Sequence, residues 1–289
     1  MRRVLVTGAT GLLGCTLVSA LEANAWFVIR HGRRTGEVRG DLSDAAVADR
    51  VIAEAQAECV VNLAAMTDVD RCEAHPREAY RHNTRVVENL ARAIGRAVPA
   101  SYLIQISTDQ VYDGPGPHDE HEVVPSNYYT FSKYAGELAA ARVPSTILRT
   151  NFFGASQCAD RTSFSDWIVR ALKRQDAVRV FTDVWFSPLS IGYLSAMICL
   201  VLERRITGVF NLGSRDGMSK AQFCYRIAEV LGLSTASMTP TESSVAALRA
   251  YRPKDMRMAC GRFERTFEVS LPALAHEIES MKEFYHEHA

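Results

Sequence analysis

Residues 7–14 read Thr7-Gly8-Ala9-Thr10-Gly11-Leu12-Leu13-Gly14, a glycine-rich sequence from which the fold class can be predicted. It joins an apolar strand pattern at 4–6 to a helical pattern that runs to about residue 24. Glycines at such a junction let the backbone turn tightly and approach a pyrophosphate, which then lies at a helix N-terminus rich in free N–H groups. The spacing is G-x-x-G-x-x-G, one residue longer than the usual dinucleotide fingerprint, and a plain strand-turn-helix is the alternative. We expect this turn to bind a dinucleotide through Gly8, Thr10, Gly11, Leu12, Leu13 and Gly14.

Beyond this turn, short β-branched runs alternate with longer helical patterns, which is typical of a parallel, doubly wound sheet. The pattern predicts strands at 26–29, 59–63, 102–106 and 146–149, a short strand before residue 40, and helices over 44–56, 76–96 and 127–141. After about residue 154 the alternation loosens, with helices at 163–173, 191–203, 219–231 and 271–285 and a strand at 209–212.

The predicted fold class is therefore α/β. Residues 1–154 are expected to form an NAD(P)-binding Rossmann core with a doubly wound parallel sheet. Residues 155–289 are expected to form a smaller, mostly helical C-terminal substrate-binding portion, of which 188–212 folds back onto the Rossmann sheet.

The composition is that of an ordinary soluble globular enzyme, with 47% hydrophobic and 23% charged residues. Lys+Arg 33 balance Asp+Glu 33, so the global charge gives no reason to expect nucleic acid or an anionic membrane as a partner. No apolar run reaches the roughly 18 residues of a membrane span. The 7 cysteines contain no C-x-x-C pair, and we expect buried free thiols in a reducing cytoplasm rather than a disulfide framework or a metal site.

The stretch after the second strand carries the cofactor preference. It reads Arg30-His31-Gly32-Arg33-Arg34, with no acid before Glu37. An acidic residue here usually binds the ribose hydroxyls of NAD, whereas arginine accommodates the 2′-phosphate of NADP. We predict NADPH, held by Arg30, Arg33 and Arg34, with NADH as the alternative cofactor and a solvated basic loop as the alternative interpretation.

Two further strand ends are expected to border the cofactor. Asp41 and Leu42 follow the short third strand and would lie near the adenine. Ala64, Ala65 and Met66 end the next strand, and their small side chains would let a cofactor lie against the backbone.

The sequence Tyr129-Thr130-Phe131-Ser132-Lys133 indicates the chemistry. Positions i and i+4 of a helix share one face, so the phenol and the ammonium are expected to point into one cleft. The ammonium would stabilise the phenolate and lower the pKa of Tyr129, which suits a proton donor or acceptor. Thr108, at the end of the fifth strand, would hold the substrate oxygen.

With these motifs the chain resembles the extended short-chain dehydrogenase/reductases, and among them it is most similar to the dTDP-4-dehydrorhamnose reductase family. The residues that carry the resemblance are 7–14, 62–70, 106–114 and 127–137, with looser matches at 148–150, 187–188 and 251–253. The resemblance implies a catalytic trio of Thr108, Tyr129 and Lys133, in which Lys133 also binds the nicotinamide ribose. It also implies that Thr108, Asp109 and Phe152 border the sugar. The C-terminal part would hold the nucleotide-diphosphate, and we assign Arg252 to this substrate site.

Three positions depart from the family pattern. Cys15 stands where some of these reductases carry a metal-binding glutamate, so no metal site is expected and a metal-linked dimer is not supported; a homodimer of another kind stays open. Gln110 stands where tyrosine is frequent, and Phe152 replaces a familiar tryptophan, so the substrate stays open as well.

The expected function is NADPH-dependent reduction of the keto group of a nucleotide-diphospho-4-keto-6-deoxysugar, with Tyr129 as proton donor. The chain also resembles the regulatory β subunit of methionine adenosyltransferase, so a non-catalytic NADP(H)-binding subunit is one alternative. An epimerase that retains its NAD is another.

Overall fold

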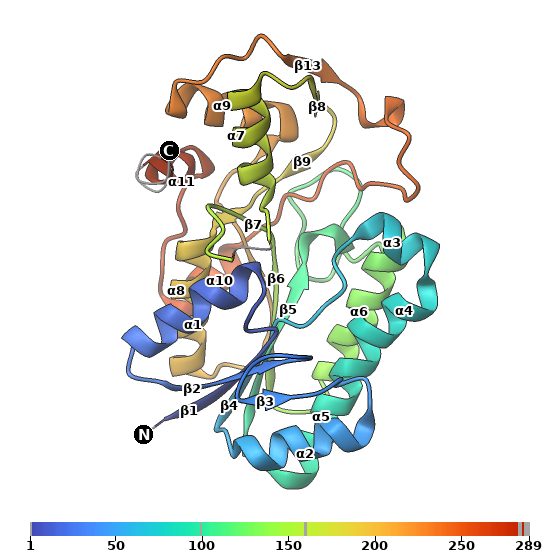
Figure 1. Ribbon diagram of the computed structural model, residues 1–289, viewed down its shortest axis with the longest axis vertical. Coiled ribbons are helices and arrows are strands. Elements are labelled where there is room, and N and C mark those ends of the chain that lie inside the picture. The colour runs from blue at the N-terminus through green and yellow to red at the C-terminus, as the bar shows by residue number, and fades with distance from the viewer. Residues whose placement is uncertain (1, 99, 159–160, 283–284, 286–289) are drawn as a thin grey trace.

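A parallel sheet of seven strands runs through the centre of the computed structural model, which describes residues 2–98, 100–158, 161–282 and 285 (Figure 1). The strand order is β11-β6-β5-β4-β1-β2-β3, and every neighbouring pair is parallel. The strands are β1 (Arg3–Thr7), β2 (Phe27–Gly32), β3 (Val38–Arg39), β4 (Cys59–Asn62), β5 (Tyr102–Thr108), β6 (Ser145–Thr150) and β11 (Gly208–Leu212). The predicted α/β class and the doubly wound parallel sheet are confirmed.

Helices cover both faces of this sheet (Figure 1). One face carries α1 (Leu12–Ala23), α8 (Ile191–Arg204) and α10 (Gly261–Phe267), and their buried side chains form one core cluster with Leu17, Ile198 and Phe263. The other face carries α2 (Ala45–Ala55), α5 (Val86–Ala97) and α6 (Tyr128–Ala140), which form a second core cluster. Strands buried on both faces explain the nearly continuous apolar runs in the sequence.

Side-chain caps set where two of the predicted helices begin. The Asp44 carboxylate accepts from the Ala46 N–H at 2.8 Å at the start of α2. The Asn127 side chain accepts from the Thr130 N–H at 2.9 Å, and the Thr130 hydroxyl accepts from the Asn127 N–H, which makes a capping box at the start of α6. This cap fixes the beginning of the helix that carries Tyr129 and Lys133.

The helix predicted over 76–96 is divided into three parts. It consists of α4 (Pro76–Tyr80), a π-helical turn η1 (Arg81–Arg85) and α5. The π turn holds the buried Asn83, whose amide accepts from the Met66 N–H at 2.7 Å and donates to the Ser132 hydroxyl at 3.0 Å. A helix not predicted from the sequence, α3 (Val69–Ala74), precedes it. The irregular turn therefore ties the segment after β4 to α6.

The chain beyond β6 adds β11 to the sheet edge and builds an upper layer (Figure 1). Its further elements are β7 (Phe152–Phe153), α7 (Phe164–Arg174), β8 (Val178–Phe181), β9 (Trp185–Phe186), β10 (Leu189–Ser190), β12 (Met218–Ser219), α9 (Lys220–Leu231), β13 (Met238–Thr241) and α11 (Leu274–Ser280). The strands outside the main sheet form three two-stranded sheets. The helix predicted over 271–285 begins three residues later, at Leu274, and its predicted end includes residues 283–284, which lie outside the described part. The division at residue 154 stays a prediction.

The expectation that all cysteines are free thiols is wrong for one pair. Cys15 and Cys158 form a disulfide, whereas the other five cysteines are free and buried. The partners are 143 residues apart, and only the folded chain brings α1 beside the segment that follows β7. Among the described helices, none is long and apolar enough to cross a membrane.

Candidate active site

The glycine-rich turn lies where β1 meets α1, at the carboxyl edge of the sheet. Gly8 has φ +68, and a Cβ on it would lie 3.1 Å from the backbone nitrogen of Ala64. A Cβ on Gly14 would lie 2.4 Å from the carbonyl oxygen of Gly8. The glycines therefore let the turn, α1 and the end of β4 pack closely. Within the described residues, no side chain caps α1 at Gly11, which leaves the N–H groups of its first turn to an anion.

A buried polar chain fixes the strand ends beneath this turn. The Thr7 hydroxyl donates to the Asn62 side-chain oxygen at 2.5 Å, and the Asn62 amide donates to the Gln105 side chain at 2.7 Å. These bonds link β1, β4 and β5 side by side. Ala64, Ala65 and Met66 come soon after β4 and are partly exposed, and of these three predicted residues the structure brings Ala64 against Gly8 of the glycine turn.

The predicted phosphate-binding arginines have different surroundings. Arg30 forms ion pairs with Glu22 at 2.5 Å and with Glu37 at 3.4 Å, so two carboxylates already balance its positive charge. Arg33 and Arg34 are exposed. These two arginines are therefore the more available cations after β2.

Asp41 and Leu42 follow β3 as expected. Leu42 is buried in the core, whereas the Asp41 carboxylate pairs with Arg81 at 2.7 Å. Burial opposes ionisation, but hydrogen bonds from Ser43 and the charge of Arg81 hold the pKa of Asp41 below its ordinary value. Arg81, from the π turn, is a further cation at this end of the site that the sequence did not indicate.

Tyr129 and Lys133 lie on the inner face of α6, with exposed fractions of 6% and 5%. The Lys133 ammonium donates to the Ile106 carbonyl at 2.7 Å. Burial lowers the pKa of Lys133 to about 8, although the Glu137 carboxylate opposes this shift.

The predicted lowering of the Tyr129 pKa is wrong for this structure. Burial raises the pKa of Tyr129 above its ordinary value, because a phenolate would lose its hydration, and the Thr108 hydroxyl opposes the shift only in part. The Lys133 ammonium is bonded to Ile106 instead. At neutral pH Tyr129 is a protonated phenol, which is the state that a proton donor needs.

Thr108 ends β5 and Asp109 follows it, and the Thr108 hydroxyl lies beside the Tyr129 phenol. The Thr108 hydroxyl donates to Asp109 at 3.2 Å, and the Asn151 amide donates to the other carboxylate oxygen at 2.7 Å. Burial raises the pKa of Asp109 to about 6, against the hydrogen bond from Asn151 and the charge of Lys220. The fold thus brings Thr108, Tyr129 and Lys133 together, as the sequence predicted.

A cavity of about 480 Å³ lies next to this group and is lined by Gln110, Asn151, Phe164, Trp167, Ile168, Arg179, Val180, Phe181, Val184, Lys220, Cys224, Leu248, Arg252, Pro253 and Met256. Of the predicted substrate residues, Arg252 lines it and is paired with Asp70 at 3.0 Å. Phe152 is not among the lining residues; it packs, half-buried, against the core cluster that contains α1 and α8.

The sequence missed Lys220 as a cavity residue. Its ammonium lies 3.3 Å from the ring centre of Phe186 and 4.6 Å from that of Phe164. Burial lowers the pKa of Lys220 to about 8, and the Asp109 carboxylate opposes the shift. Its only sequence signal is its place directly after Ser219, the N-cap of α9, which says nothing about a cavity.

This fold and this trio of side chains define an oxidoreductase of the extended short-chain dehydrogenase/reductase type. The chain belongs to the RmlD substrate binding domain family, whose model matches residues 1–286.

Named relatives span nearly the same length. A probable low-salt glycan biosynthesis reductase, Agl14, of Haloferax volcanii is 30% identical and covers 96% of both chains. The dTDP-4-dehydrorhamnose reductase of Sinorhizobium fredii is 29% identical and covers 93% of both. The methionine adenosyltransferase 2 subunit beta of Bos taurus is 28% identical over 91% of this chain and 82% of its own. Among solved structures, a Bacillus anthracis dTDP-4-dehydrorhamnose reductase in complex with NADP superposes with TM-score 0.89, at 25% identity, over 99% of this chain and 100% of that one.

Proposed function

We propose that the protein reduces the keto group of a nucleotide-diphospho-4-keto-6-deoxysugar with NADPH. The observation that carries this proposal is the buried group of Thr108, Tyr129 and Lys133 at the carboxyl edge of the sheet, with a cavity of about 480 Å³ beside it. The named reductases among the relatives, and the NADP bound to the solved one, support it.

The glycine turn fits the pyrophosphate of such a cofactor, because the backbone around Gly8 and Gly14 is close-packed and the first turn of α1 offers its N–H groups. NADPH, when bound, supplies the hydride that reaches the carbonyl carbon. Thr108 would align the carbonyl oxygen, and Tyr129, a phenol at neutral pH, would donate its proton to the alkoxide. Lys133 would hold the nicotinamide ribose.

The preference for NADPH would rest on the cations after β2. Arg33 and Arg34 are exposed and free to meet a 2′-phosphate, whereas Arg30 would have to leave Glu22 or Glu37. We expect charge-assisted bonds from Arg33 and Arg34 to supply most of the discrimination. Asp41 and the segment 64–66 would border the adenosine half, whereas the Leu42 side chain is buried in the core.

The sugar nucleotide would occupy the cavity. The Gln110 side-chain oxygen is buried without a hydrogen-bond partner among the described residues, so a substrate hydroxyl would satisfy it. Arg252 and Lys220 would face the diphosphate or the sugar oxygens, and Trp167 offers an aromatic face for a base. Asp109 would border the sugar beside Thr108, as the family resemblance implies.

Asp109 and Gln110 also favour reduction over 4,6-dehydration. An elimination needs a second carboxyl after the threonine, and the amide of Gln110 cannot take a proton at neutral pH. Simple keto reduction needs one proton, which Tyr129 supplies. With NAD⁺ and a nucleotide-diphospho-hexose, we therefore expect no 4-keto-6-deoxy product.

The second candidate is a cofactor-binding regulatory subunit, because one named relative is the β subunit of a methionine adenosyltransferase. NADPH oxidation measured with and without 4-keto sugar nucleotides separates the two. Oxidation that depends on the sugar nucleotide supports the reductase. Tight NADPH binding without turnover, with a stoichiometric protein partner, supports the subunit.

We further propose that the protein acts in the cytoplasm, and we leave a homodimer open.

A further inference from the structure

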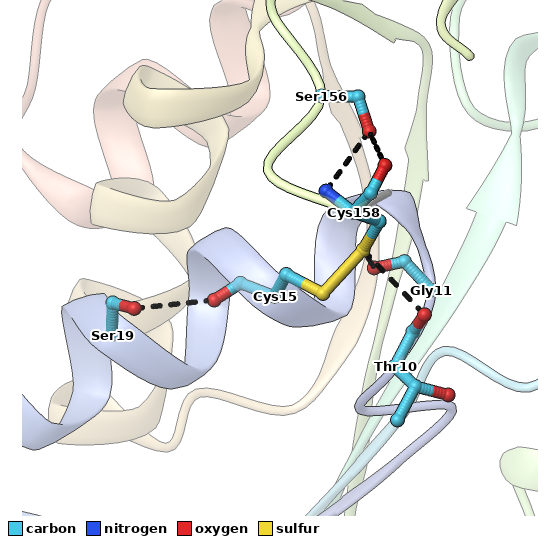
Figure 2. Close-up of a disulfide and its surroundings, with 6 residues drawn as sticks. All are labelled: Thr10, Gly11, Cys15, Ser19, Ser156 and Cys158. Atoms are coloured by element: carbon cyan, nitrogen blue, oxygen red, sulfur yellow. Dashed lines mark hydrogen bonds between the residues drawn. A yellow bond between two sulfur atoms is a disulfide. The ribbon is translucent and has the colours of Figure 1, made fainter. Parts of the chain in front are cut away.

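The disulfide lies directly against the turn that the cofactor pyrophosphate would contact. Cys15 follows Gly14 in α1, and its Cα lies 6.5 Å from that of Cys158, within the usual range for a disulfide. Figure 2 shows the two sulfurs joined above the start of α1, with Thr10 and Gly11 next to them. The Cys158 sulfur lies 3.2 Å from the Gly11 carbonyl oxygen and 3.5 Å from that of Thr10.

The bridge connects two parts of the fold that, among the residues the structure describes, no backbone hydrogen bond joins at this place. On one side is the glycine turn. On the other, the segment 154–158 is fastened to α7: the Gly154 N–H donates to the Ser165 hydroxyl at 2.9 Å, and the Ser156 N–H donates to Asp166 at 3.1 Å. Oxidation therefore joins α1 covalently to a segment that is hydrogen-bonded to α7, at the edge of the proposed dinucleotide site.

Cys15 and Cys158 are also the cysteines that a reagent in solution can reach. Both are only partly buried, whereas the other five are buried and free. A small thiol or disulfide in solution can reach Cys15 and Cys158, and thiol–disulfide exchange requires such access. Five free thiols fit the reducing compartment proposed above, where a disulfide is usually transient or redox-sensing.

We propose that Cys15 and Cys158 form a reversible thiol–disulfide site that controls the exchange of the dinucleotide at the glycine turn. In the oxidised form the segment 154–158 cannot withdraw from the turn, so cofactor entry and release are slowed. In the reduced form the bridge no longer ties this segment to the turn, and exchange is fast. This inference rests on dinucleotide binding, which is part of the proposed function, and not on the identity of the sugar.

The chemistry balances with a small disulfide such as oxidised glutathione. The thiolate of one cysteine attacks a glutathione sulfur and expels one glutathione thiolate, which leaves a mixed disulfide. The thiolate of the second cysteine attacks the protein sulfur of that intermediate and expels the second glutathione. Two protein thiols are oxidised, one glutathione disulfide is reduced to two thiols, and the two protons pass to the released thiolates.

The test is the kinetics of NADPH binding, followed by stopped-flow fluorescence after treatment with oxidised glutathione or with dithiothreitol. Thiol alkylation and peptide mass spectrometry report the state of each cysteine. We expect association and release to be at least about fivefold slower in the oxidised protein, as for binding that needs a conformational change. The double variant Cys15→Ser/Cys158→Ser, which leaves no accessible sulfur for glutathione to modify at this place, should exchange NADPH at the reduced wild-type rate under both treatments. Cys199→Ala, at a buried cysteine of α8, should keep the redox dependence.

Two results would overturn the proposal. One is equal NADPH exchange in the oxidised and reduced wild type with the bridge shown to be present. The other is full alkylation of Cys15 and Cys158 after treatment with oxidised glutathione. Because the readout is cofactor exchange, it does not depend on whether a sugar nucleotide is turned over, so a failed reductase assignment is distinguished from a failed redox site.

Discussion

The Arg149 guanidinium and the Glu137 carboxylate form a buried ion pair at 2.6 Å, with side chains that are 3% and 2% exposed. Three hydrogen bonds join the two groups, and they connect β6 to α6, the helix that carries Tyr129 and Lys133. Arg149 also donates to the Tyr112 hydroxyl at 2.8 Å. The position of the catalytic helix therefore depends on a charge pair inside the protein.

Removing one partner of this pair should destabilise the fold strongly. Arg149→Met leaves the Glu137 carboxylate buried without its cation, and we expect a loss of about 3–5 kcal/mol in the free energy of unfolding. Arg149→Met combined with Glu137→Leu should recover much of this loss, because no unpaired charge remains. Arg71→Ala, which breaks an exposed pair with Glu78, is the matched control and should cost less than about 1 kcal/mol. Urea unfolding measures all three, and equal costs for Arg149→Met and Arg71→Ala would contradict the account.

Asp109 predicts a specific pH dependence of stability. Its carboxyl has a pKa raised from 3.8 to about 6 in the folded protein, so the folded state binds more protons than the unfolded state between these values. Stability contributed by this group is therefore present below about pH 4 and lost as the pH rises to about 6. Relative to Asp109→Asn, the wild type should lose about 2–3 kcal/mol across that window. Parallel stability curves for the two proteins between those pH values would show that Asp109 does not titrate as described.

Helices could be predicted from the sequence where the residues that determine them lie close together in the chain. The capping side chains of Asp44 and Asn127 act within three residues of their own positions, so the starts of α2 and α6 were predictable. The Tyr129–Lys133 spacing likewise depends only on helix geometry.

The features that the sequence missed depend on the folded chain. Cys15 and Cys158 are 143 residues apart, and Lys220 reaches the cavity only because α9 packs over it. The predicted lowering of the Tyr129 pKa was also wrong, because burial raises this pKa and the Lys133 ammonium donates to the Ile106 carbonyl instead. The π turn at 81–85 carries no helix-breaking residue, so a continuous helix was the natural expectation.

The arginines after β2 should separate NADPH from NADH. Arg33→Ala and Arg34→Ala should each weaken NADPH binding by about 1.5–3 kcal/mol, the usual contribution of a hydrogen bond to a charged group, and leave NADH binding nearly unchanged. Arg30→Ala should have a smaller effect, since Arg30 is already paired with Glu22 and Glu37. Fluorescence titration of each variant with both cofactors gives the comparison. Equal losses for NADPH and NADH would exclude a 2′-phosphate contact.

Lys133→Met should impair both cofactor binding and turnover, because it removes the proposed ribose ligand and the bond to the Ile106 carbonyl. Lys133→Arg keeps the charge but, since its planar guanidinium is larger and buried there, should not restore full activity. Dissociation constants for NADPH and initial rates with a 4-keto sugar nucleotide report the two effects separately. A Lys133→Met variant with wild-type NADPH affinity would remove the ribose role.

Proton donation by Tyr129 during keto reduction can be measured as the rate of NADPH oxidation with a dTDP-4-keto-6-deoxyhexose. The rate is compared for the wild type, Tyr129→Phe and Tyr128→Phe, the last being the exposed neighbour on the same helix. We expect sugar-dependent oxidation by the wild type and by Tyr128→Phe. For Tyr129→Phe we expect a rate lower by about 10²–10⁴-fold, the usual contribution of a general acid, with NADPH affinity unchanged. Wild-type turnover by Tyr129→Phe would exclude Tyr129 as the proton donor.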